Sequence, residues 1–213
     1  MQFDLRGQNL EAVMDFIFGH PVPTIQGETG WWWESDVDVD LEEYAANLIA
    51  IFRTPAVLRS RYTREQLEQG FWMLISGAEP SLEHVLWDSA VPWSVRTALI
   101  QATVDLYEKL FAFDFLDTSA YMFWDGLAYG YCVPTRHPET DVEDRRVQEA
   151  MFSALTQILE IDSLSCQLAA LHGLGHLRHP NTEKAITTYL VRNPTLGEDH
   201  RRFAVACITG DIA

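Results

Sequence analysis

The feature that most constrains this chain is a helix-forming segment that recurs about thirty-five residues later. Residues 166–177 and 202–212 share one outline, in which three pairs of positions match: Ala169 with Ala204, Gly175 with Gly210, and Leu177 with Ile212. A helix-forming segment on each side of a turn at this spacing is typical of helical repeats. Because one such unit cannot bury its apolar face alone, we expect it to stack on neighbouring helices.

Helical patterns also dominate the rest of the 213 residues. The segments that begin at Thr63, Thr140 and Thr195 match the capping-box spacing, in which side chains satisfy free amides at a helix start. Strand-like alternation is limited to residues 37–41, where every polar residue is an aspartate, so we expect an extended lead-in to a helix there. The sequence therefore predicts an all-α fold of stacked antiparallel helix pairs.

We expect residues 1–213 to form a single all-α domain with three parts. Residues 1–54 carry acidic N-terminal helices and a tryptophan-containing loop. Residues 55–162 carry degenerate helical pairs, and residues 163–213 carry the repeat and a terminal half-repeat.

The repeat resembles a known family. Its core, Ala170-Leu-His-Gly173-Leu174-Gly175-His-Leu177, is similar to the first-helix core of HEAT-like repeats, the variety also found in phycobilisome lyases. The resemblance covers residues 163–213 and implies an α-solenoid, a superhelix whose concave side commonly binds other macromolecules. It implies no reaction. The two glycines also predict a close approach between neighbouring helices, which offsets the helix penalty of glycine, ~1 kcal/mol against alanine.

An excess of acidic side chains sets the composition apart. Thirty-one acidic residues face fifteen lysines and arginines, which gives a formal net charge of −16. Residues 1–52 alone hold ten acids and one arginine. Repulsion from phosphate backbones argues against nucleic-acid binding. One interpretation of the excess charge is solubility. The alternative is steering toward a basic protein partner, because a field of one sign speeds association at low salt.

The sequence also indicates a compartment. No run approaches eighteen apolar residues, so we expect no membrane span. The first residues lack the basic and apolar regions of a secretory signal. The three cysteines are odd in number and have no CxxC spacing, which fits reduced thiols in the cytoplasm.

Three consecutive tryptophans, Trp31, Trp32 and Trp33, form the first candidate site. Adjacent side chains diverge in any regular structure, so the three indoles cannot all face inward. One interpretation is that two of them fill the core beneath the loop. The alternative is that at least one is presented to a ligand or a partner, where tryptophan is a favoured anchor. The acids that follow favour a basic, partly apolar partner, and they complete the predicted partner-binding set: Glu34, Asp36, Asp38 and Asp40.

His172 and His176 form the second candidate site. They lie four residues apart on one helical face, a spacing at which two imidazoles can share a metal ion. His179 precedes Pro180 and is expected outside the helix. Metal hydroxylases with a HEAT-like fold carry His-Glu pairs ahead of the repeat core, whereas this chain has residues 168–169, Leu-Ala, at that place. The alternative is that both histidines occupy variable repeat positions that face a neighbouring helix or solvent.

Asp125 lies among aromatic residues between 121 and 131, and apolar company of this kind raises a carboxyl pKa. No paired acid or nucleophile is close to it in the sequence, and Cys132, Cys166 and Cys207 have no local catalytic context.

The leading hypothesis from the sequence is a non-enzymatic helical-repeat protein that binds a basic protein partner and needs no cofactor. An immunity-type protein that neutralises such a partner is a specific version. The alternative is a metal-dependent enzyme that uses His172, His176 and a carboxylate brought in by the fold. A second alternative is a small-ligand binder that uses the loop at residues 31–33. The sequence leaves the oligomeric state open.

Overall fold

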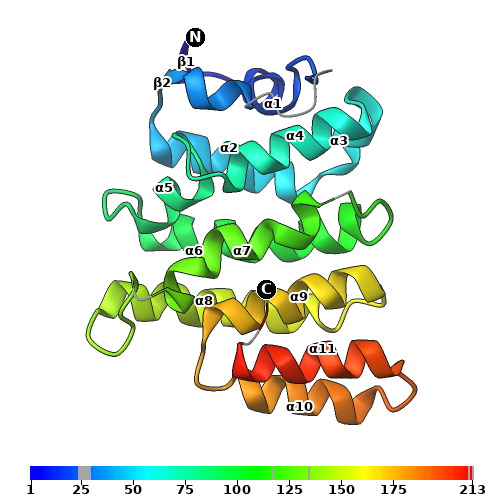
Figure 1. Ribbon diagram of the computed structural model, residues 1–213. Helices are drawn as coiled ribbons and strands as arrows, with labels where there is room; N and C mark the ends of the chain where they lie inside the picture. Colours follow the sequence, from blue (N-terminus) through cyan, green and yellow to red (C-terminus); the bar gives the residue numbers. More distant parts are fainter. Residues whose placement is uncertain (24–29, 117, 134, 211, 213) are drawn as a thin grey trace. The chain divides into compact units, whose positions relative to one another are not determined.

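The computed structural model describes residues 1–23, 30–116, 118–133, 135–210 and 212, and within these the fold is all-α, as predicted (Figure 1). The α-helices are α1 (Leu10–Phe18), α2 (Leu41–Arg53), α3 (Ala56–Arg61), α4 (Arg64–Ile75), α5 (Leu82–Trp87), α6 (Trp93–Leu106), α7 (Ser119–Cys132), α8 (Val142–Ile158), α9 (Leu164–Leu177), α10 (Thr182–Arg192) and α11 (Glu198–Thr209). The described residues also form a 3₁₀ turn, Trp31–Glu34, and a π-helical turn, Tyr107–Phe111.

The contacts divide the chain into two compact units, Met1–Ala120 and Tyr121–Ala213. In the first unit, α2 packs against α6 and α1 packs against α4. In the second, α9 packs against both α8 and α11, and α10 packs against α11.

A short parallel sheet joins the first residues to the segment that follows the tryptophans. Strand β1 (Gln2–Asp4) pairs with β2 (Asp36–Asp38), with Phe3 opposite Val37. The extended lead-in to a helix expected at residues 37–41 therefore overlaps a paired strand, and α2 begins at the end of this segment. Local alternation could not reveal the pairing, because the partner strand lies more than thirty residues earlier in the chain.

The helix starts show which capping signals are used. Thr63 forms the predicted capping box with Gln66 at the start of α4. The boxes predicted at Thr140 and Thr195 are wrong. Asp141 caps α8 instead, with its carboxylate accepting from two amides, and Gly197 precedes α11. Asp141 follows Thr140 directly, and its carboxylate accepts from the free amides of residues 143 and 144 at the start of α8. Its negative charge also interacts favourably with the helix dipole.

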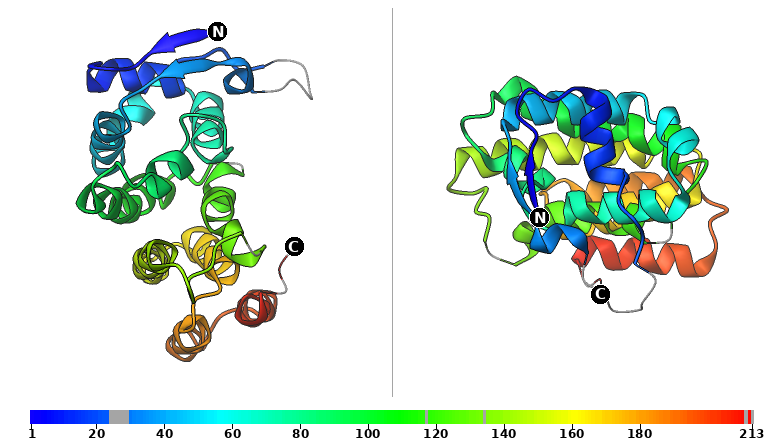
Figure 2. Two further views of the ribbon diagram at one scale, coloured as in Figure 1. Left: turned by 90° about the vertical axis from the view of Figure 1, so that its left-hand side faces the viewer. Right: turned by 90° about the horizontal axis from the view of Figure 1, so that it is seen from above.

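Both repeat glycines lie at close helix contacts, which confirms their predicted role. A Cβ on Gly173 would lie 2.6 Å from the Cβ of Trp124 on α7, and one on Gly175 would lie 3.3 Å from the Cα of Cys207 on α11. The left view of Figure 2 shows α8, α9, α10 and α11 nearly end-on. Helix α10 follows α9 and packs against α11. The continuation of this stacking into a superhelix stays a prediction.

No helix in the described part of the chain combines the length and the apolar character that a bilayer span requires.

Candidate functional site

The two histidines of the repeat project from one face of α9. The hydroxyl of Ser163 accepts from the Cys166 amide at the start of this helix, and Arg178 ends it in a left-handed conformation with φ of 53°. Residues four apart share a face of an α-helix, so the rings of His172 and His176 are neighbours. Both are buried, with exposed fractions of 1% and 6%. They therefore face a neighbouring helix and not solvent.

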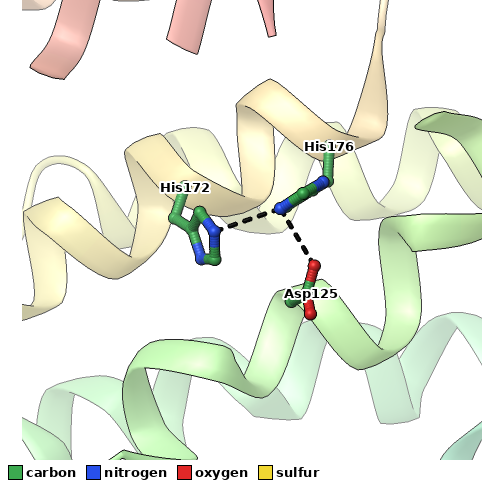
Figure 3. A group of neighbouring side chains, drawn as sticks. All are labelled: Asp125, His172 and His176. Atoms are coloured by element: carbon green, nitrogen blue, oxygen red, sulfur yellow. Dashed lines mark hydrogen bonds and ion pairs between the residues drawn. The ribbon is translucent and has the colours of Figure 1, made fainter. Parts of the chain in front are cut away.

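That neighbouring helix is α7, which brings Asp125 to the histidines (Figure 3). Oδ1 of Asp125 lies 2.9 Å from Nε2 of His176, and Nε2 of His176 lies 3.0 Å from Nε2 of His172. One ligand atom from each residue lies within 4.8 Å of the other two. The fold thus supplies the carboxylate that the metal alternative requires.

Hydrogen bonds alone do not satisfy this cluster. A neutral imidazole nitrogen offers either one N–H or one lone pair, along a single direction in the ring plane. Nε2 of His176 faces two partners at hydrogen-bonding distance, so one proton cannot make a linear bond to both. A cation placed between the three atoms accepts all of their lone pairs at once.

The rings are oriented by packing. Tyr121 stacks on His172 with ring centroids 4.6 Å apart and an interplanar angle of 9°. Tyr129 lies against His176 at 5.9 Å. The Nδ1 atoms of both histidines are buried without a hydrogen-bonding partner in the described chain. Aromatic contacts therefore take the place of the carboxylate or carbonyl acceptor that often orients a metal-binding imidazole.

The three groups have different protonation preferences. The hydrogen bond from His176 lowers the pKa of Asp125, which corrects the expectation of a raised pKa. Burial lowers the pKa of His172, and the neighbouring His176 lowers it further. Burial opposes the charged form of His176 as well, but its hydrogen bonds with Asp125 and Cys132 outweigh burial and raise its pKa. These shifts favour an ionised Asp125 and a neutral His172, which are the forms that bind metal ions. The raised pKa of His176 instead favours its protonated form, so a metal ion would have to displace that proton.

Cys132 is a further titratable group beside this cluster. Its sulfur lies 3.6 Å from Nη2 of Arg178. Burial alone would raise the pKa of the thiol, but hydrogen bonds with Arg178 and His176 lower it overall. The sequence neighbours of Cys132 gave no sign of these contacts. Cys166 and Cys207 are buried and their thiol pKa values are raised by burial, to about 12 for Cys207.

The tryptophans and acids of the first candidate site lie in the other unit. Trp31 stacks on His20 at 3.5 Å, Trp32 is buried, and Trp33 is 57% exposed. The acids predicted to accompany them are all exposed: Glu34, Asp36, Asp38 and Asp40. Asp40 also accepts from the amides of residues 42 and 43 and so caps α2. Asp38 lies 3.4 Å from Arg6.

The sequence pattern identified the histidine pair but not its partner. Asp125 was visible as an acid among aromatics, yet no spacing linked it to His172, 47 residues later in the chain. His179 lies outside α9, as expected. Its ring stacks on that of Phe152, with the ring centroids 4.0 Å apart, and it is not part of the cluster. Comparisons of this chain with protein-family models, with curated proteins and with solved structures found no match.

Proposed function

We propose that the protein binds one divalent transition-metal ion through Asp125, His172 and His176, and that its function depends on this ion. The position of Nε2 of His176 between two partners, 3.0 Å from His172 and 2.9 Å from Asp125, carries the proposal. The two histidines and a fold-supplied carboxylate are the ligands of the metal-dependent alternative. The close contact of three buried or half-buried ligands favours this alternative over a purely non-enzymatic repeat protein.

The spacing of the ligand atoms suits such an ion. Metal bonds of about 2.0–2.2 Å at angles between octahedral and tetrahedral values put neighbouring ligand atoms about 2.8–3.6 Å apart. The two short separations in the cluster are 2.9 and 3.0 Å, at the lower end of this range. Two imidazoles and one carboxylate suit zinc, iron, cobalt or nickel better than magnesium or calcium, which prefer oxygen ligands.

Metal binding would also offset the free-energy cost of burying the two imidazoles with unsatisfied nitrogen atoms. Two buried imidazoles that share one proton leave part of their hydrogen-bonding capacity unused, and unsatisfied buried polar groups cost about 1–3 kcal/mol each. A bound ion contributes favourable energy at the same atoms. Binding to the folded state alone would also stabilise the protein by mass action, by about 2.7 kcal/mol at a hundredfold excess over the dissociation constant.

The test is metal content and metal-linked stability in protein purified without a histidine tag. We expect one zinc, iron, cobalt or nickel ion per chain after reconstitution, and a fall in the melting temperature on chelation. The variants D125N, H172Q and H176Q should lose both effects. H137Q is the matched control, because His137 is exposed and lies outside the cluster. Substoichiometric metal in the reconstituted parent, with a melting temperature that does not respond to chelation, would reject the proposal.

A second function is favoured by one observation, the exposure of Trp33 next to four exposed carboxylates. This surface, defined by Trp33, Glu34, Asp36, Asp38 and Asp40, suits a basic protein partner with an apolar pocket for the indole. We call it the Trp33 surface. It belongs to the unit that lacks the metal ligands, so both functions can coexist in one chain.

A further inference from the structure

The number of ligands at the cluster limits what a bound ion can do. Among the described residues, the group with metal-ligand spacing comprises Asp125, His172 and His176. Structural zinc sites are closed by four protein ligands, whereas sites with three protein ligands keep a position for water or another small molecule. The question is therefore whether the chain offers a fourth ligand.

Cys132 is the side chain that comes nearest to this role. Its thiol interacts with His176 through a hydrogen bond, but it does not belong to the set of ligand atoms that lie within 4.8 Å of one another. The thiol also contacts Arg178, whose guanidinium donates to the carbonyls of Thr209 and Gly210. Anchored in this way to the end of α11, Arg178 holds the thiol in a contact that competes with metal ligation.

Solvent reaches the cluster on the side of Asp125. The side chain of this residue is 24% exposed, whereas that of His176 is 7% exposed. Tyr121 and Tyr129 lie on α7, the helix that carries Asp125, and their rings contact those of His172 and His176. Tyr129 is half exposed. The open position of an ion would thus lie next to an aromatic rim on α7, with access from water.

The charge of the occupied site defines its ligand. A divalent ion with one carboxylate and two neutral imidazoles carries a net charge of +1, in a chain whose formal net charge is −16. The local charge attracts an anion, and partial burial strengthens that attraction by lowering the effective dielectric constant. The surrounding negative field opposes ligands of high charge. A small monoanion matches both conditions.

We infer that the metal ion bound by Asp125, His172 and His176 keeps a coordination position free of protein ligands, and that this position binds small monoanions. This inference rests on the proposed function. It differs from it in requiring an open site, whereas metal binding alone is equally compatible with a site closed by Cys132.

Cobalt substitution of the full chain separates these cases. Cobalt(II) bound to the metal-free protein should give visible d–d absorption, and azide should shift these bands in a saturable titration. The C132S variant should give the same cobalt spectrum and the same azide response, because the thiol is not a ligand. The control for non-specific anion effects is perchlorate, a weakly coordinating anion, which should leave the spectrum unchanged.

Two results would overturn the inference while leaving metal binding intact. One is a thiolate-to-cobalt charge-transfer band in the parent that C132S removes, since this would identify Cys132 as a fourth ligand. The other is a cobalt spectrum that azide does not change in either protein. Absence of protein-bound cobalt absorption in the parent would instead reject the proposed function, and the inference with it.

Discussion

Gly173 on α9 lies directly against Trp124 on α7, where an added Cβ would come within 2.6 Å of the Cβ of Trp124 and 2.8 Å of Leu155. Asp125 is the next residue on α7, and His172 and His176 flank Gly173 on α9. The contact that brings the two helices together therefore also brings the carboxylate to the imidazoles. A glycine that serves packing in the repeat has a direct consequence for the site.

The substitution G173A should weaken both the fold and metal binding. Overpacking of a tight contact costs about 1–3 kcal/mol, which exceeds the gain of at most about 1 kcal/mol from replacing a helical glycine with alanine. Separation of α7 from α9 should also move Asp125 away from His176. Urea unfolding of the metal-free protein and zinc titration of the folded protein measure the two effects separately.

G197A is the control for this experiment. A Cβ at Gly197 meets nothing within 4 Å, so the substitution should cost at most a capping preference at the start of α11 and leave zinc affinity unchanged. The proposed link between helix packing and the site fails if G173A binds zinc as tightly as the parent despite reduced stability.

The fold was predictable to the extent that its signals are local. The capping of α4 follows from residues within one turn of the start of the helix. The pairing of β1 with β2 was missed because a three-residue strand of alternating aspartates carries too little local preference, and its partner is distant in the sequence. Periodicity reports which face of an element is buried, but not which element covers it.

The same limit applies to the site. The spacing of His172 and His176 is a property of one helix, so the sequence revealed it. The position of Asp125 depends on how α7 packs on α9, and the contact of Cys132 with Arg178 depends on where α9 ends. Both are tertiary relationships. Gly173 in the sequence predicted a close contact between two helices. The structure shows that the contact is with Trp124, the residue before Asp125.

The two histidines should titrate in opposite directions in the metal-free protein. His176 should have a pKa above its ordinary value of 6.5, because its hydrogen bonds with Asp125 and Cys132 outweigh burial, and His172 should have a pKa below 6.5 because of burial. In D125N the pKa of His176 should fall, since burial then opposes its charged form with less compensation. Nitrogen-15 NMR of the imidazoles across pH 4–9 measures each pKa.

The sign of the stability effect follows from these shifts. The raised pKa of His176 contributes stability that is fully present below pH 6.5 and is lost as the pH rises through its folded-state pKa. The lowered pKa of Asp125 contributes stability that is present above pH 3.8 and is lost as the pH falls through its folded-state pKa. The parent should therefore exceed D125N in unfolding free energy most clearly between pH 3.8 and 6.5. A difference that grows toward pH 9 would contradict the proposed pairing.

Alkylation should distinguish the three cysteines. Cys132 is half-buried and the pKa of its thiol is lowered by Arg178 and His176 against the effect of burial. Cys166 and Cys207 are buried with raised thiol pKa values. Because the thiolate is the reactive form, iodoacetamide should label Cys132 first in the native protein. Intact mass and peptide mapping follow the reaction, and denatured protein, in which all three should react, is the control. Preferential labelling of Cys207 would contradict the packing of α11 against α9.

The last prediction concerns the Trp33 surface. It is tested with a basic protein that the immobilised full chain captures from cell extract. Charge should govern the encounter, so the triple variant D36N/D38N/D40N should associate more slowly and show a weaker dependence on salt concentration. An asparagine at position 40 can still cap α2, which keeps the fold intact. W33A should instead speed dissociation, at a cost on the order of 2 kcal/mol if the indole is a binding hot spot. Surface plasmon resonance at several salt concentrations separates the two rates.

Matched controls test whether the location of the substituted residues affects binding, beyond the loss of charge or of an exposed ring. F113A removes another exposed aromatic ring of the same unit, since Phe113 is 75% exposed, and should leave dissociation unchanged. The triple variant E183Q/E198Q/D199N removes the same number of exposed carboxylates from the other unit. If it slows association as much as D36N/D38N/D40N does, the net charge alone steers the partner and the Trp33 surface has no special role. Slower association only when the acids beside Trp33 are neutralised, together with faster dissociation of W33A, is the outcome expected of a defined interface.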